Sequence, residues 1–508
     1  MVYNIVKKNE NIVLYAVSAL GIVFAYSYLF LIAPLSSDTV GAYFIGNGAN
    51  LNPAWSVANG RWGRAAFEVL LQFIGYNNII PIICLILSII ICPIFCVKLV
   101  RIFQFKSIIV SIFVCVTIFL TPAFVELFSF FEDFYTHIFI STLLMTILLD
   151  FYLVKKNTVI SIIIFSIIIG IYQSYFCFVT SIILMFYLKK LISDSNYSVD
   201  NKDIVRFIVF NICSLALYFI TSLLAMKFFN INSVLSQRFL NSDTSVVSLA
   251  FKHIIKIYGM IAILPFKNYA GLNTTPLMKF VFTFIYVFIL YRIIHIIKNG
   301  KFKRNIHLIL LLFVLPVFMN SIALLGTNIT IRMTQGLGLV YLLFSVFVDE
   351  YITSYNTKNY FCIISLIYGL IAFNMMYFAN GYSYHLGIAS EATKSFCVEL
   401  VSNIRNTVGY NSNSKVYFHG SVSYKNLFDY YAYIDDKSFP LPTPNNSLIF
   451  PWEYRETFER YAAFKYEMPT ETEIQKLVSA EEFANMNVYP NYGSIKYIDN
   501  VIVVKFNE

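Results

Sequence analysis

The chain carries few charged residues for its length. Only 13% of its 508 residues are Asp, Glu, Lys or Arg, whereas soluble globular proteins carry about 25%. So little charge cannot cover a water-soluble protein of this size, and much of the surface must therefore face lipid. Hydrophobic residues make up 58% of the chain, and its mean hydropathy is +0.68. The sequence therefore predicts a polytopic α-helical membrane protein.

Motifs of the common nucleotide-using enzymes are also missing. The sequence contains no P-loop, no dinucleotide-binding glycine motif, no protein-kinase signature and no nucleophile elbow. A nucleotide-sugar donor therefore has no support in the sequence. Metal-ligand spacing of His, Cys, Asp and Glu is missing too. We expect no cofactor. A divalent metal would have to bind to the two adjacent acids Glu132 and Asp133.

Charge is unevenly divided between two parts of the chain. From Gly381 to the end there are 11 Lys and Arg against 15 Asp and Glu, so this tail carries about −4 and the remainder about +13. The basic residues lie in short loops between apolar runs, which indicates membrane topology and not nucleic-acid binding. We predict a multi-span domain over residues 1–380 and a small α/β domain over residues 381–508.

Apolar runs long enough to cross a bilayer recur along the membrane part. A lysine pair precedes Val159–Leu188 and another follows it, so both of its ends face the cytoplasm. The run must therefore form two short helices that turn near Gly170–Gln173. The other predicted spans are Ile12–Pro34, Ile79–Val97, Ser107–Phe124, Tyr135–Val154, Ile204–Met226, Lys279–Ile297, Ile306–Leu325, Met333–Val348 and Tyr360–Ala379.

Basic loops set the predicted orientation. Lys98–Lys106, Lys155-Lys156 and Lys298–Arg304 mark cytoplasmic loops. Lysines interrupt Val246–Leu264, which we interpret as an amphipathic helix on the outer interface. The count is then about eleven spans, with the N-terminus in the cytoplasm and the C-terminal domain outside it.

The tail has a mixed pattern of short helices and strands. Its predicted helices are Leu386–Asn406, Thr457–Tyr466 and Glu471–Ala484, and its predicted strands are Lys415–His419 and Ile498–Phe506.

The first predicted outer loop contains a carboxylate directly after a span. Asp38 at the water–lipid boundary can accept a proton from a sugar hydroxyl, which is the work of a general base. Alternatively, Ser36, Ser37 and Asp38 are all good N-caps for a following helix. The two readings are evenly matched on the sequence alone.

Two arginines follow in the sequence Asn59-Gly60-Arg61-Trp62-Gly63-Arg64. Arg61 and Arg64 have the forked donors that grip a lipid phosphate, although Arg64 and Glu68 are also spaced to pair with each other. Trp55 and Trp62 are candidates for stacking on a sugar ring, and the alternative, an interfacial aromatic belt, is favoured.

Further candidates lie in later outer segments. Glu132 and Asp133 can bind a divalent ion or a sugar hydroxyl, or form a solvated loop. Tyr172 and Gln173 lie at the predicted turn, where a glutamine needs a partner or a cavity. Arg332 precedes a span and suits a second phosphate contact, with snorkelling as the alternative.

The order of these features resembles a known family. Ser37-Asp38 after a span, the Asn-Gly-Arg of residues 59–61, the acidic second outer loop and the Ile-Tyr-Gln of residues 171–173 occur in the same order in the type II serotype-converting glucosyltransferases of bacteria. This family is a branch of the membrane glycosyltransferase superfamily C. The resemblance covers Ala33–Gly338.

The resemblance implies a function and its partners. The donor would be polyprenyl-phosphate-glucose, made by a partner transferase and moved across the bacterial inner membrane by a flippase. The acceptor would be a lipid-linked surface polysaccharide such as the O-antigen of lipopolysaccharide. Asp38 would be the catalytic base, and Arg61 would match the family's Gly-Arg motif. Family members often have two adjacent acids where this chain has Ser37-Asp38, so Asp38 alone remains as the candidate there.

Three rival functions remain open on the sequence. A surface-polysaccharide polymerase or ligase is also polytopic, with basic outer loops. A transporter or flippase would place charges within spans and often show an inverted repeat, and few such charges and no repeat are present. A scaffold for envelope assembly would need no chemistry at all.

Overall fold

A computed structural model describes most of the chain. The described residues are 9–32, 53–73, 81–131, 134–194, 197, 199–231, 246–264, 266, 272, 275–298, 302–324, 330–355, 358–423, 447–449 and 454–507.

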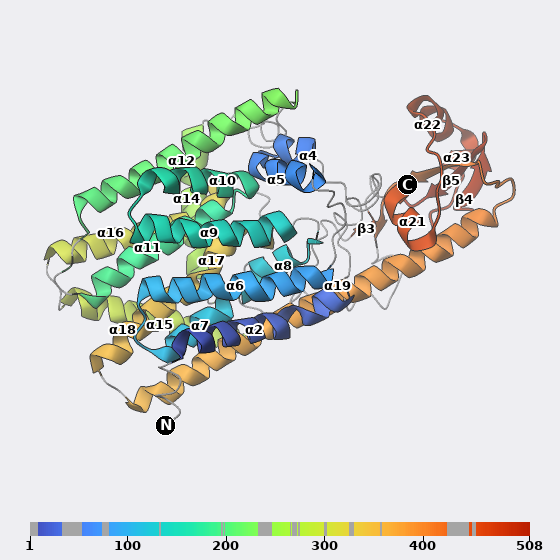
Figure 1. Ribbon diagram of the computed structural model, residues 1–508. Helices are drawn as coiled ribbons and strands as arrows, with labels where there is room; N and C mark the ends of the chain where they lie inside the picture. The colour runs from blue at the N-terminus through green and yellow to red at the C-terminus, as the bar shows by residue number, and fades with distance from the viewer. Residues whose placement is uncertain are drawn as a thin grey trace.

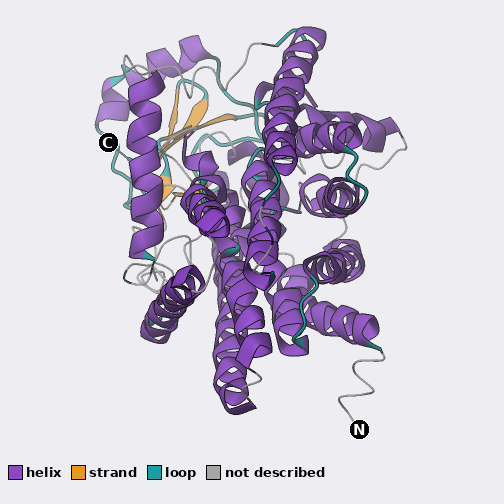
Figure 2. Ribbon diagram, turned by 90° about the vertical axis from the view of Figure 1, so that its left-hand side faces the viewer, coloured by secondary structure: helices purple, strands orange, loops and turns teal. Residues whose placement is uncertain are grey.

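Helices form a bundle whose axes run roughly along one direction (Figure 1). Strands are confined to one side of the molecule, in the C-terminal part (Figure 2). The membrane part contains α2 (Glu10–Ile32), α4 (Pro53–Ala58), α5 (Trp62–Phe73), α6 (Pro81–Phe103), α7 (Ile108–Thr117), η1 (Ile118–Leu120), α8 (Pro122–Phe128), η3 (Phe134–Ile140), α9 (Ser141–Leu149), η4 (Asp150–Val154), α10 (Thr158–Ile171), α11 (Tyr175–Ser193), α12 (Asn201–Phe228), α14 (Val246–Ile263), α15 (Pro276–Lys298), α16 (Phe302–Met319), η5 (Ser321–Leu324), η6 (Ile331–Met333), α17 (Gln335–Gly338), α18 (Val340–Tyr355) and α19 (Lys358–Arg405).

The predicted polytopic helical architecture is confirmed. Among the described residues, eight helices are long and apolar enough to cross a membrane, or nine if a bent pair counts as one span. The count of eleven stays a prediction, as does the interfacial position of α14. The lysine-flanked run does form two helices, because α10 ends at Ile171 and α11 begins at Tyr175, but only α10 is short, since α11 has 19 residues.

The bent pair is the span predicted as Ser107–Phe124. It breaks at Thr121-Pro122, and the two halves are bent by 48°. Thr121 is extended, and Pro122 occupies the first turn of α8, where its missing N–H leaves no hydrogen bond unmade. The break carries α8, and with it Glu126, to one end of the bundle.

An aromatic cluster packs α2 against α8 and η3 at that end. The ring of Tyr26 stacks on Phe128 at 4.2 Å between centroids, and Phe30 contacts Phe128, Phe131 and Phe134. All five rings are almost completely buried. We call this the loop end, because α4, α5 and the C-terminal domain also lie there (Figure 1).

The last helix joins the bundle to the C-terminal domain. α19 is a single helix of 48 residues. Asn380, within it, donates a hydrogen bond to the carbonyl oxygen of Phe24 in α2 at 3.0 Å. The domain boundary predicted at residue 380 lies inside this helix, and a separate hydrophobic core begins at Phe396.

The C-terminal domain packs helices against a small mixed sheet. Strand β5 lies in the centre, parallel to β1 and antiparallel to β4, and β2 pairs with β3 in a separate ribbon. Every residue of β5 is buried. The elements are β1 (Lys415–His419), β2 (Val422–Ser423), β3 (Ser447–Ile449), α21 (Tyr454–Ala462), α22 (Glu471–Val478), α23 (Glu481–Ala484), β4 (Ile495–Ile498) and β5 (Val501–Lys505).

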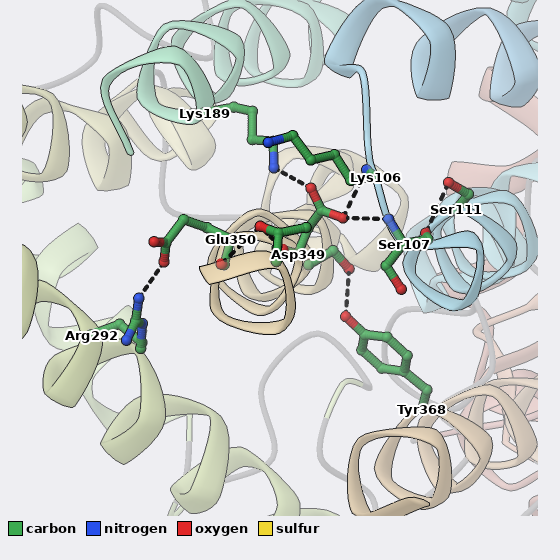
Figure 3. A network of polar contacts seen from close by, with 10 residues as sticks. Lys106, Ser107, Ser111, Lys189, Arg292, Asp349, Glu350 and Tyr368 are labelled. Atoms are coloured by element: carbon green, nitrogen blue, oxygen red, sulfur yellow. Dashed lines mark hydrogen bonds and ion pairs between the residues drawn. The ribbon is translucent and has the colours of Figure 1, made fainter. Parts of the chain in front are cut away.

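A buried ion pair ties three helices together at the opposite end of the bundle (Figure 3). Asp349 of α18 is fully buried, and its carboxylate pairs with Lys189 of α11. The same carboxylate accepts hydrogen bonds from the backbone N–H groups of Lys106 (3.0 Å) and Ser107 (2.8 Å) at the start of α7. We call this the basic end, because Lys98, Arg101, Lys189 and Lys190 also lie there.

Candidate functional site

The site begins at the turn between α4 and α5. Gly60 has a φ of 71°, in the left-handed region that glycine adopts without a steric penalty. The turn is closed by hydrogen bonds from the N–H of Gly60 to the oxygen of Val57 and from the N–H of Arg61 to the oxygen of Ser56. The glycine therefore lets the chain reverse so that Arg61 directly precedes α5.

The turn is fastened to two other segments. Gln173 donates from Nε2 to the carbonyl oxygen of Asn59 at 2.9 Å. Tyr218 of α12 donates from its hydroxyl to the oxygen of Gly60 at 3.0 Å and accepts from Gln173 at 3.2 Å. The predicted partner for Gln173 is thus the Asn-Gly-Arg turn itself, and the two short motifs form one unit.

Arg61 and Arg332 meet at Tyr172. The guanidinium carbon of Arg61 lies 5.3 Å from the centre of the Tyr172 ring, and the Tyr172 hydroxyl donates to the carbonyl oxygen of Arg332 at 3.4 Å. Burial raises the pKa of Tyr172, and the charges of Arg332 and Arg61 lower it by a smaller amount. The phenol therefore keeps its proton at neutral pH.

Arg332 is positioned from the other side by α8. Its backbone N–H donates to Oε2 of Glu126 at 2.9 Å, and its guanidinium lies 3.9 Å from the centre of the Phe130 ring. Glu126 is buried, with 4% of its surface exposed. The break at Pro122 therefore serves the site, because it presents Glu126 to the segment that carries Arg332.

Arg64, in contrast, is engaged within its own helix. Its Nε contacts Oε1 of Glu68 at 2.5 Å, and the hydroxyl of Ser56 donates to Oε2 at 2.9 Å. Glu68 is fully buried, so the pair fixes α4 against α5. This is the i, i+4 alternative that the spacing offers.

The two tryptophans differ in their surroundings. Trp62 packs on α10, where a Cβ built at Gly170 would lie 2.6 Å from the indole. Trp55 is 55% exposed. Trp62 therefore packs α5 against α10, and Trp55 is the tryptophan whose ring is accessible at the surface.

Gly63 gives a test of this packing. A Cβ at Gly63 would lie 2.8 Å from the carbonyl oxygen of Ile167, so Gly63→Ala forces α5 away from α10. We expect a loss of about 1–3 kcal/mol in unfolding free energy, measured by thermal denaturation in detergent. Gly369→Ala in α19 is the control, because nothing lies within 4 Å of the added methyl group. Equal stability of the two variants would contradict the close helix contact.

Three predicted site residues lie outside the described residues. They are Asp38, Glu132 and Asp133. Asp38 follows Ile32, the last described residue of α2, by six positions, and Glu132 and Asp133 lie between Phe131 and Phe134.

Sequence reasoning missed three residues of the cluster. His137 is fully buried, with its ring 4.7 Å from that of Tyr172, and its Nδ1 lies 3.1 Å from the hydroxyl of Thr136. Glu126 precedes Glu132 and Asp133 in the sequence by six and seven positions, and Tyr218 is one of 37 tyrosines. Of the three, only Glu126 could be suspected from the sequence, because an acid at the end of a span needs a partner.

No metal centre is apparent in the described part of the chain. Within it, no three His, Cys, Asp or Glu side chains gather closely enough to hold an ion.

Fold and site together define a polytopic helical membrane protein with an arginine-lined polar cluster at one end. The model of one family, described as glucosyl transferase GtrII, matches residues 27–348. This chain belongs to that family and is a membrane glucosyltransferase. The match begins within α2 and ends in α18, so it includes every described residue of the site and leaves out α19 and the C-terminal domain. No curated protein and no solved structure matches the chain.

Proposed function

We propose that the protein transfers glucose from polyprenyl-phosphate-glucose to a lipid-linked surface polysaccharide, with Asp38 as the general base. The observation that carries this proposal is the meeting of Arg61 and Arg332 at Tyr172, at one end of an apolar bundle. The guanidinium of Arg61 lies over the ring of Tyr172, and the positive charge of Arg332 also acts on this phenol. Two such arginines offer several donors to a phosphate. A bundle end is where a lipid carrier presents its head group.

Arg61 and Arg332 have the better claim to the phosphate. Both residues lie at Tyr172, whereas Arg64 pairs with Glu68 in its own helix. Trp55 is the better candidate for stacking on a sugar ring, since Trp62 is packed on Gly170. Glu132, Asp133, Tyr172 and Gln173 remain proposed contacts of the sugar and the acceptor.

The proposed reaction is a single displacement at the anomeric carbon. Asp38 takes the proton of an acceptor hydroxyl, whose oxygen forms a bond to the anomeric carbon. The bond from that carbon to the phosphate oxygen breaks, and the polyprenyl phosphate leaves with the electron pair. Arginines stabilise the negative charge that develops on the leaving phosphate.

The distribution of basic residues supports the proposed orientation. Lys98 and Arg101 lie near the end of α6, Lys155 follows η4, and Lys189 and Lys190 lie near the end of α11. α6 and α11 end away from α4 and α5 (Figure 1). Positive residues favour the cytoplasmic side, so we place the loop end and the C-terminal domain on the outer side of the bacterial inner membrane. A donor made in the cytoplasm then needs a flippase as a partner.

A reconstituted transfer assay tests the proposal. The purified protein in detergent receives polyprenyl-phosphate-glucose labelled in the sugar, with lipid-linked polysaccharide as the acceptor. We expect label to move to the acceptor, also in the presence of EDTA, because a phosphate with arginine partners is a good leaving group. Longer polysaccharide chains without added label would indicate a polymerase, and label that only crosses a vesicle membrane would indicate a transporter.

Arg61→Lys separates the forked guanidinium from its charge. Lysine keeps the charge but presents a point donor in place of a fork, so we expect the rate of glucose transfer to fall roughly 10²-fold. The turn should persist, because Gln173 and Tyr218 hold its backbone carbonyls. Arg405→Lys, where the guanidinium contacts Phe464 in the C-terminal domain, is the matched control. An unchanged rate for Arg61→Lys would remove this residue from the phosphate site.

A further inference from the structure

A polar cavity lies at the basic end, far from the proposed site of transfer. Its volume is about 390 Å³, and it lies between the last turns of α6, η4 and α11. Four cationic side chains line it, namely those of Lys98, Arg101, Lys189 and Lys190. None of the described residues that line it is acidic.

The four cations divide into two pairs. Lys98 and Lys189 form the walls and are already paired, with Asp150 and Asp349 respectively. Arg101 and Lys190 are exposed at the mouth. Arg101 uses its Nε in a hydrogen bond to Oδ1 of Asn11 at 2.7 Å, and the ammonium of Lys190 lies 4.5 Å from the centre of the Phe186 ring. The two mouth cations therefore offer charge to a ligand that arrives from outside.

The rest of the lining is apolar. Phe103 and Phe186 are buried against the floor, and Leu153 and Val154 form one side. Val154 is 58% exposed, and Lys155 follows it directly. The cavity thus opens where the apolar belt of the bundle meets its basic loops.

An amphiphilic anion fits these surroundings better than a soluble one. A free phosphate would use the cations but not the aromatic floor or the open apolar side. A phospholipid places its phosphate and its acyl chains at the same boundary, and basic pockets between membrane helices bind anionic head groups. The volume is enough for a phosphate and its glycerol but not for a whole lipid, so the chains would run along the outside of the bundle.

We propose that this cavity binds the head group of an anionic phospholipid from the leaflet that borders the basic end. Arg101 and Lys190 hold the phosphate, and the Phe186 face of the cavity packs against the glycerol. The proposal is independent of the transfer reaction at the loop end.

Lipid binding to the full-length protein tests the proposal. Native mass spectrometry of the delipidated protein in detergent measures the affinity for phosphatidylglycerol and for phosphatidylcholine. We expect tighter binding of phosphatidylglycerol, and a loss of about 10- to 30-fold in that affinity in the double variant Arg101→Gln/Lys190→Gln. Both side chains are exposed, so the variant should fold, which gel filtration checks.

The control removes two cations from the same end without touching the cavity. Lys202→Gln/Lys298→Gln changes exposed lysines at the start of α12 and at the end of α15. The proposal is overturned if this control loses as much affinity as the first variant, because binding would then reflect surface charge alone. It is also overturned if the first variant binds phosphatidylglycerol as tightly as the wild type, or if millimolar glycerol phosphate competes as well as the lipid.

Discussion

Asp38→Asn should abolish most glucose transfer, with a fall of about 10²- to 10⁴-fold in rate, the range that a general base contributes. Asparagine keeps the size of the side chain and its capacity to cap a helix, but it cannot take a proton from the acceptor hydroxyl. The measurement is the glucose content of the surface polysaccharide in cells that express the variant, together with the reconstituted transfer rate.

A control variant, the membrane level of each variant and the polysaccharide chain length distinguish a glucosyltransferase from a polymerase. Asp499→Asn, at an exposed ion pair with Lys476 in the C-terminal domain, is the matched control and should leave transfer unchanged. Membrane levels of both variants must equal that of the wild type. A change in polysaccharide chain length would favour a polymerase, and normal glucose content in Asp38→Asn would exclude Asp38 from the mechanism.

Asp349→Ala should be the most destabilising single change at the basic end. It leaves Lys189 as a buried charge with no carboxylate, and it also removes the acceptor for the two backbone N–H groups of Lys106 and Ser107, directly before α7. Removing one partner of a buried ion pair costs about 3–5 kcal/mol. Thermal denaturation in detergent should show this loss, since α7, α11 and α18 all depend on the one carboxylate (Figure 3).

Two further variants separate charge from hydrogen bonding. Lys189→Met/Asp349→Leu removes both charges, so it should recover part of the loss but not all of it, because the N–H groups of Lys106 and Ser107 stay without an acceptor. Glu473→Gln breaks an exposed pair with Lys415 and should cost far less. If Asp349→Ala were as stable as Glu473→Gln, the buried pair would not hold the three helices together.

Local patterns in the sequence predicted the helices well, and long-range continuity poorly. The lysine pairs around Val159–Leu188 predicted a hairpin that the structure contains, because charge next to an apolar run fixes which side of the membrane it faces. The change in net charge from Gly381 onward predicts two domains, and α19 runs through this position as one helix. Packing of Asn380 against α2 outweighs the poor helix propensity of glycine there.

The sequence names individual candidate residues for the site, but it does not predict which of them contact one another. The Asn-Gly-Arg and Ile-Tyr-Gln segments are more than a hundred positions apart, and no local rule says that Gln173 bonds the oxygen of Asn59. The spacing of Arg64 and Glu68 is local, so their pairing could be read in advance. Arg332 is brought in by Glu126 through a break at Pro122, which depends on tertiary packing.

The unbroken course of α19 constrains how the protein can move. At 1.5 Å per residue its 48 residues extend about 72 Å, more than twice the hydrocarbon thickness of a bilayer. The C-terminal domain is thus carried on a rigid strut and cannot swing freely above the bundle. One residue inserted near Gly387 would rotate the whole domain by about 100° around the axis of the helix. Seven inserted residues make about two full turns and would nearly restore its original orientation.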